Sequence, residues 1–245
     1  MNRLALAVLA FFATANTLAG SRVVETIRFD LDGDGKPDKL VLSDVDDGAA
    51  DKKGDKEGDF TRIDFHLGNA KHFRFSNPDR WIRFDRDPET RARITGSAAS
   101  LIQSARLLLV DTVEGDRLLI AIGYGYASDP SLLSAYRISK TGIVQVMDKN
   151  LDLVKVADID HDGRTDIVGS QISEGIGENC SSYDPDLVYT LRDLFKVNSS
   201  LTERYDRKTD GFYSADYSKF FVLRRKDGKR VLLPNDQQDR CKAQP

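Results

Sequence analysis

Short segments in which apolar and polar residues alternate dominate the chain. The clearest runs from 61 to 67, where isoleucine, phenylalanine and leucine occupy every second position. Such alternation is typical of a strand with one face on a core and the other in solvent. Comparable segments, separated by glycine and aspartate, follow at 73–75, 104–113, 117–126, 133–139, 142–147, 153–157, 166–172, 187–191, 201–205, 220–225 and 229–233. This pattern predicts an all-β fold, in which only 88–105 could hold a short helix.

Two segments interrupt the alternation and are interpreted as loops. Segment 44–59 carries many charges of both signs and almost no apolar residue, and segment 173–186 is rich in glycine, serine and aspartate. Polar segments of this kind usually connect strands at the surface. The tripeptide from Lys226 to Gly228 lies between the last two apolar segments and predicts a hairpin turn.

The chain also contains an internal repeat. Segment 29–41 matches segment 157–168, and segment 107–120 has the same apolar–turn–apolar outline around Gly115 without the acidic residues. The first interval between repeats is longer by about the length of segment 81–103, which we interpret as an insertion. The repeat predicts about three four-stranded sheets followed by a C-terminal hairpin, all in one domain over 20–245.

The two matching repeats share the pattern D-x-D-x-D-G-x-x-D. Its acidic positions are Asp30, Asp32, Asp34 and Asp38 in the first copy and Asp158, Asp160, Asp162 and Asp166 in the second. Ca²⁺ takes six to eight oxygen ligands, so closely alternating carboxylates can surround one ion. The glycine allows a sharp turn, and Lys36 or Arg164 would add a backbone carbonyl. Acidic turns also occur on surfaces without metal, but two copies with identical spacing favour two Ca²⁺ sites.

An EF-hand does not fit these loops. That motif requires an acidic residue at the twelfth position and helices on both sides. Here the twelfth positions are Val41 and Gly169, and the flanking segments are strand-like. The loop followed by an apolar strand resembles instead the calcium loop of FG-GAP or VCBS-type repeats, which build integrin-like β-propellers. The resemblance implies that each loop joins the first two strands of a blade. Because the chain is short for a full propeller, we expect an open or truncated propeller-like arrangement.

The N-terminal segment predicts export. Arg3 precedes an apolar run over 4–12, and small residues then offer cleavage after Ala15 or Ala19, as in a secretory signal peptide over 1–19. The run is too short to span a bilayer, and no later segment is long enough. A periplasmic or secreted protein is therefore expected. In that compartment Cys180 and Cys241 either form one disulfide, which we favour, or remain as two free thiols.

Composition and motifs exclude several functions. The 36 basic and 39 acidic residues give a net charge of −3, which disfavours a nucleic-acid partner. The sequence has three histidines, but no Gly-x-Ser-x-Gly, His-Glu-x-x-His or phosphate-binding glycine loop. No catalytic residue is therefore assigned, and an enzyme is not expected.

Aromatic residues among glycine and serine suggest a binding surface. Segment 206–219 contains Phe212, Tyr213 and Tyr217, a composition favoured at interfaces. Tyr124 and Tyr126 could belong either to a surface or to a strand end. We therefore expect an exported calcium-binding module that binds another protein.

The size and export signal resemble those of small periplasmic immunity or inhibitor proteins. The resemblance implies a peptidoglycan hydrolase, a cell-wall-degrading effector, as the partner. The alternatives are a carbohydrate-binding or adhesion module, whose partner would be a glycan, and a hydrolase with an unrecognised site.

Overall fold

The structure, a computed structural model, consists mainly of strands and confirms the all-β class. It describes residues 20–45, 58–84, 100–101, 107–112, 115–123, 132–171, 175–177, 179–190 and 196–241. The predicted signal peptide, Tyr124 and Tyr126, and most of the predicted helix at 88–105 and of the predicted loop at 44–59 lie outside these residues. None of the helices in the described part is long and apolar enough to cross a membrane.

The first sheet has nine strands. They are β1 (Ser21–Phe29), β2 (Asp38–Val45), β3 (Phe60–His66), β4 (His72–Ile82), β5 (Ser100–Leu101), β6 (Leu108–Asp111), β7 (Arg117–Gly123), β8 (Leu132–Ser139) and β9 (Gly142–Asn150). Strands β1 to β4 form one antiparallel meander and β5 to β9 a second. The two meanders join where Trp81 and Ile82 of β4 pair with Gly123 and Ile122 of β7. The first two repeats were predicted as separate sheets, but they form one continuous sheet. They join because the end of β4, which reaches the segment interpreted as an insertion, pairs with β7.

Two four-stranded sheets follow. One contains β10 (Asp152–Ala157), β11 (Asp166–Ser170), β14 (Leu187–Thr190) and β15 (Lys196–Val197), and the other β12 (Gly175–Gly177), β13 (Cys180–Ser182), β16 (Phe220–Arg224) and β17 (Arg230–Pro234). Three short helices accompany them: α2 (Ser199–Thr209), η3 (Tyr217–Lys219) and η4 (Asn235–Cys241). The predicted C-terminal hairpin is β16–β17, and it belongs to a complete four-stranded sheet.

Two local predictions were wrong. Segment 201–205 lies in α2, where the side chain of Asn198 caps the helix by accepting the Leu201 N–H at 3.1 Å. A pattern of five residues is too short to distinguish a strand from one face of a helix, and here Leu201 packs against Val168 and Val188.

Segment 173–186 contains the short strands β12 and β13 rather than irregular chain alone, because β16 offers a strand edge with which β13 pairs.

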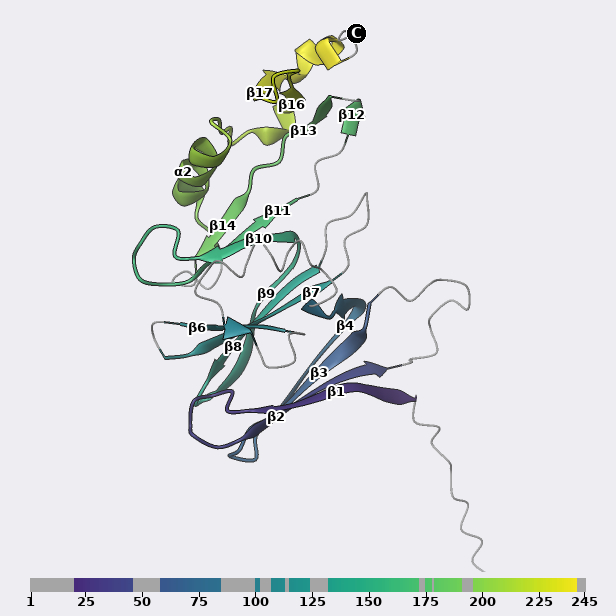
Figure 1. Cartoon of the computed structure of the whole chain (residues 1–245), viewed down its shortest axis with the longest axis vertical. Helices are drawn as coiled ribbons and strands as arrows, with labels where there is room; N and C mark the ends of the chain where they lie inside the picture. The colour runs from purple at the N-terminus through teal and green to yellow at the C-terminus, as the bar shows by residue number, and fades with distance from the viewer. Residues whose placement is uncertain are drawn as a thin grey trace, which may run out of the picture.

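The sheets follow one another along the longest axis of the molecule (Figure 1). The nine-stranded sheet lies at one end and the β12–β13–β16–β17 sheet at the other. Within the described part of the chain the sheets form no closed barrel. The expected propeller-like arrangement of the sheets remains a prediction.

Buried apolar residues connect the sheets. One cluster, with Phe65, Trp81 and Tyr136 at its centre, lies within the nine-stranded sheet. A second cluster combines Met147 of that sheet with Ile167 of the next. The first sheet and the β10–β11–β14–β15 sheet therefore pack on a shared core.

The predicted disulfide is confirmed. Cys180 of β13 is bonded to Cys241 at the end of η4, across a sequence separation of 61 residues. Cys180 is buried against Phe221, Leu223 and Leu233 of the same sheet. Because it closes a long loop, the bond restricts the unfolded chain and stabilises this small sheet.

Candidate metal centres

Each acidic loop joins two neighbouring antiparallel strands. The first runs from the end of β1 to the start of β2, where Phe29 pairs with Asp38, and the second joins β10 to β11, where Ala157 pairs with Asp166. The ninth position of the motif is thus the first residue of the second strand in both copies. This is the position in the hairpin that the resemblance implies.

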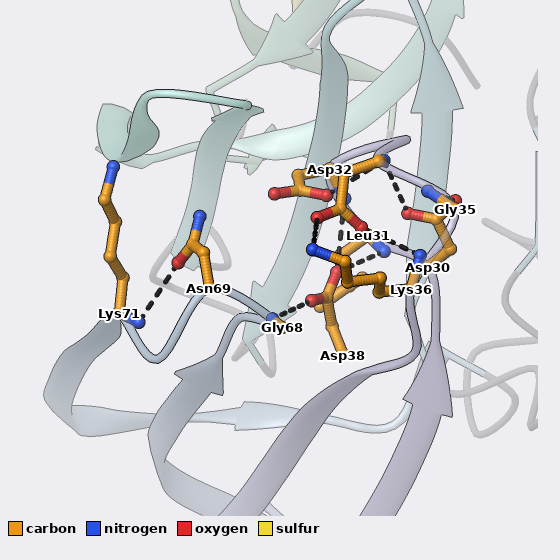
Figure 2. Close-up of polar contacts among 10 residues, drawn as sticks. Asp30, Leu31, Asp32, Gly35, Lys36, Asp38, Gly68, Asn69 and Lys71 are labelled. Carbon is orange, nitrogen blue, oxygen red and sulfur yellow. Dashed lines mark hydrogen bonds and ion pairs between the residues drawn. The ribbon is translucent and has the colours of Figure 1, made fainter.

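Asp38 organises the first loop. Its side chain is almost completely buried, with 1% of its surface exposed. Its Oδ2 accepts the N–H of Leu31 at 2.7 Å and of Asp32 at 3.3 Å, and its Oδ1 accepts the N–H of Gly68 at 2.6 Å (Figure 2). Since Gly68 lies between β3 and β4, one carboxylate ties the loop to a neighbouring turn.

Asp30 shapes the turn from the other side. Its two carboxylate oxygens accept the N–H groups of Asp34 at 3.1 Å and of Gly35 at 3.0 Å. The chain can bend this tightly because Gly33 and Gly35 adopt positive φ angles of 72° and 83°. The loop therefore arranges its own carboxylates through backbone hydrogen bonds.

The second loop repeats this network. Ile159 N–H donates to Asp166 Oδ2 at 2.9 Å, and Asp158 accepts the N–H groups of Asp162 at 3.1 Å and Gly163 at 2.9 Å. These three bonds correspond to those that Leu31, Asp34 and Gly35 donate in the first loop. The bonds from Asp32 and Gly68 to Asp38 have no counterpart among the described residues of the second loop. The spacing of the motif therefore gives the same local structure in two separate sheets.

Both loops bring three carboxylates together. Oxygens of Asp30, Asp32 and Asp38 lie within 4.8 Å of one another, and so do those of Asp158, Asp160 and Asp166. Ca–O distances are about 2.4 Å, so two oxygens on the same ion lie no more than about 5 Å apart. Each cluster could therefore hold a metal ion, and its ligands would all be oxygen atoms.

The fifth and seventh positions differ from the prediction in part. Asp34 and Asp162 are outside the two clusters, and each accepts the N–H of the residue two positions later, Lys36 at 2.8 Å and Arg164 at 2.9 Å. Lys36 Nζ also lies 3.7 Å from Asp34 Oδ2. Backbone donors therefore compete for the carboxylates at the fifth position. The carbonyl role of Lys36 and Arg164 remains a prediction.

Burial and mutual repulsion make the clusters costly to ionise. Burial raises the pKa of Asp32, and its acidic neighbours raise it further. Burial, with repulsion from Asp158, Asp160 and Asp162, raises the pKa of Asp166 to about 6. A divalent cation would oppose both effects, because it stabilises the charged carboxylates.

The middle repeat places an arginine where the acidic loops have aspartate. Arg117 is the first residue of β7, paired with Asp111, and so corresponds in register to Asp38 and Asp166. Nearby, Asp116 is neutralised by Arg137, whose Nε and Nη2 each lie 2.6 Å from its Oδ2. The guanidinium of Arg137 thus balances the charge of Asp116 beside the turn of the middle repeat, which lacks the acidic residues of the other two.

Arg117 also connects the second repeat to the first acidic loop, which sequence reasoning missed. Its Nη1 donates to the carbonyl oxygen of Asp30, and its guanidinium lies 5.3 Å from the centre of the Phe29 ring. The contact spans 87 positions. No local pattern could reveal it.

The three aromatic residues predicted to bind a partner differ in exposure. Phe212 packs edge-on against Tyr183 at 5.6 Å, with the Arg230 guanidinium 5.9 Å from its ring. Tyr213 is half-buried, whereas Tyr217 is 41% exposed. Among them, Tyr217 is therefore the best-placed side chain for a partner, and the predicted role of all three remains a prediction.

No protein-family model matches the chain, and comparisons with curated proteins and with solved structures give no match. The resemblance to FG-GAP and VCBS-type repeats therefore depends on the two loops and on the strand pattern.

Proposed function

We propose that the protein is an exported calcium-binding β module whose two ions hold its hairpins in register, and that it acts by binding another protein. The observation that carries the proposal is the repeated cluster. Two loops, in different sheets, share several backbone-to-carboxylate hydrogen bonds, and each gathers three carboxylates within 4.8 Å. Surface turns without a ligand have no need of this shared geometry.

Calcium suits these residues better than other common metals. The clusters offer only carboxylate oxygens, whereas zinc usually takes histidine nitrogen or cysteine sulfur. Mg²⁺ requires a tight octahedral shell and releases its waters reluctantly, but Ca²⁺ accepts irregular shells of six to eight oxygens. Backbone carbonyls and water would complete the shell around three carboxylates.

The role of calcium would be structural. Asp38 contacts the loop before β2 and the turn between β3 and β4, so an ion bound to it would stabilise the β1–β2 hairpin against its neighbour. An ion at Asp166 would act in the same way on β10 and β11.

Export and partner binding rest on other features. The disulfide fits an oxidising compartment, in line with the signal-like N-terminus. Within that setting, neutralising a cell-wall-degrading hydrolase is the protein-binding function that we put first, with Phe212, Tyr213 and Tyr217 as its candidate surface. Carbohydrate binding is the second candidate, because Asn77, Asp148 and Tyr189 are among the residues that line a polar cleft between two sheets.

Calorimetry of the mature chain tests the calcium proposal. About two Ca²⁺ ions should bind, and Asp32→Ala and Asp160→Ala should each remove about one. Asp227→Ala is the matched control, because Asp227 also accepts a backbone N–H two residues later but lies outside both clusters. Unchanged stoichiometry in both cluster variants would contradict the proposal. Co-purification from a periplasmic extract with Ca²⁺ present then tests for a hydrolase partner.

A further inference from the structure

A polar cleft of about 510 Å³ lies between the nine-stranded sheet and the β10–β11–β14–β15 sheet. We call it the inter-sheet cleft. Strands β4, β9 and β14 contribute to it, and the chain leaves β9 for β10 along its side. The polar residues that line it include Asn77, Asp79, Asp148, Asn150, Gln171 and Tyr189. Its volume falls in the range of small-molecule sites, about 300–1,000 Å³.

Tyr189 contributes its hydroxyl group to this cleft. Only 4% of the residue is exposed, and among the residues that the structure describes none hydrogen-bonds to its side chain. Burial alone raises the pKa of Tyr189. The hydroxyl is not among the buried polar atoms without a partner in the described part of the chain, so the solvent of the cleft reaches it. A ligand with hydrogen-bonding groups would take the place of that solvent.

Asp148 is held in place from the core. The indole N–H of Trp81 donates to Ser134 Oγ at 3.0 Å, and Ser134 Oγ donates to Asp148 Oδ1 at 3.0 Å. Trp81 and Ser134 are both fully buried. This chain of hydrogen bonds fixes one carboxylate oxygen of Asp148 and leaves the other able to accept from a ligand. Hydrogen bonds from buried residues that hold a binding group in place preorganise a binding site.

The composition of the cleft selects the class of ligand. Asp79 and Asp148 face a single cation, Lys149, so an anion such as phosphate would meet net negative charge. The amides of Asn77, Asn150 and Gln171 each donate and accept. Leu132 and Leu151 are the aliphatic side chains that line the cleft. Hydroxyl groups, which also donate and accept, match this set better than apolar peptide side chains.

We infer that the inter-sheet cleft binds an uncharged, hydroxyl-rich saccharide, with the Tyr189 hydroxyl and the Asp148 carboxylate among its hydrogen-bond partners. A peptide would instead be expected to add to a sheet edge and to use pockets for its side chains. The inference does not depend on calcium or on the proposed protein partner, because no cleft residue belongs to either acidic loop.

The test is saccharide binding by the mature, disulfide-bonded protein in excess Ca²⁺. A glycan array, followed by calorimetry with cellotetraose, maltotetraose, mannotriose and chitotriose at up to about 5 mM, should find at least one ligand. Tyr189→Phe, which removes only the hydroxyl, and Asp148→Asn should each weaken its binding about five- to tenfold. Asp227→Asn, the same change as Asp148→Asn on an exposed turn outside the cleft, should leave affinity unchanged.

Three results would overturn the inference. They are the absence of saccharide binding, saccharide binding that neither cleft variant weakens, and binding of a polar peptide that Tyr189→Phe weakens in place of a saccharide. Melting curves of Tyr189→Phe separate lost binding from lost folding, because removal of a hydroxyl that no described residue hydrogen-bonds should change stability little. Calcium binding measured in the same samples shows whether the proposed function fails independently.

Discussion

His161 occupies the position in the second acidic loop that Gly33 occupies in the first, and both residues are left-handed, with φ angles of 63° and 72°. Glycine adopts this conformation freely, whereas other L-residues pay about 1–2 kcal/mol for it. Histidine is among the residues that tolerate it better. The second loop therefore carries backbone strain that the first avoids.

Relieving this strain should stabilise the protein. His161→Gly is expected to raise the free energy of unfolding by about 0.5–1 kcal/mol, and Gly33→Ala to lower it by about 1 kcal/mol. A Cβ added at Gly33 meets no atom within 4 Å, so the second effect would come from the backbone angle alone. Denaturant unfolding with and without Ca²⁺ measures both. A neutral Gly33→Ala would show that the loop relaxes.

Calcium should stabilise the fold through two independent sites. A ligand that binds only the folded state adds about 2.7 kcal/mol at a hundred times its dissociation constant, so millimolar Ca²⁺ should raise the melting temperature by several degrees. Asp160→Ala should remove about half of this response, because the loop at Asp30 remains. Mg²⁺ should substitute poorly. A melting temperature unaffected by Ca²⁺ and by chelation would argue against structural ions.

Stability should depend on the ionisation of Asp206. Its side chain is buried in α2, accepts the Asp186 N–H and contacts the Tyr183 hydroxyl. Burial, together with repulsion from Asp186 and Asp210, raises its pKa from 3.8 to about 7. The native state then keeps a proton that the unfolded chain releases near pH 4, so this group makes the protein less stable as the pH rises from about 4 to 7.

Asp206→Asn imitates the protonated acid and should flatten that decline. Chemical unfolding between pH 5 and 8 in excess Ca²⁺ provides the comparison, because bound calcium would keep Asp166 ionised throughout. Parallel pH profiles for the wild type and the variant would rule out Asp206 as the source.

The disulfide should stabilise mainly the C-terminal sheet. Cys180→Ser with Cys241→Ser is expected to lower the free energy of unfolding by about 2–4 kcal/mol. Hydrogen exchange should increase first in β13, β16 and β17, because Cys180 packs there with Phe221 and Leu233. Thiol titration of the denatured, unreduced wild type should find no free thiol. Two free thiols would refute the bond.

Substitutions of the three aromatic residues should separate effects on folding from effects on partner binding. Tyr217→Ala is expected to weaken an identified protein partner by about 2 kcal/mol without unfolding the chain, because the side chain is 41% exposed. Tyr213→Ala should also weaken it, whereas Phe212→Ala should lower stability as well, through lost packing on Tyr183. If Tyr213→Ala and Tyr217→Ala both leave affinity unchanged, the surface lies elsewhere.

The sequence by itself determined the features that depend on neighbouring residues. Alternation over 61–67 predicted β3 because a strand turns successive side chains to opposite faces. The spacing of Asp30 and Asp38 predicted an acidic turn between two strands, since the hydrogen bonds within the loop span at most seven positions. The disulfide was also predictable, because only two cysteines were available to pair.

Only the tertiary structure decided the features that join distant segments. The β4–β7 pairing fused two predicted sheets, and packing on β11 and β14 made 201–205 a helix. Arg117 reached the first loop, and Tyr189 met Asp148 at a cleft, through contacts between strands far apart in the chain. Such contacts depend on how sheets pack, which local alternation and spacing do not encode.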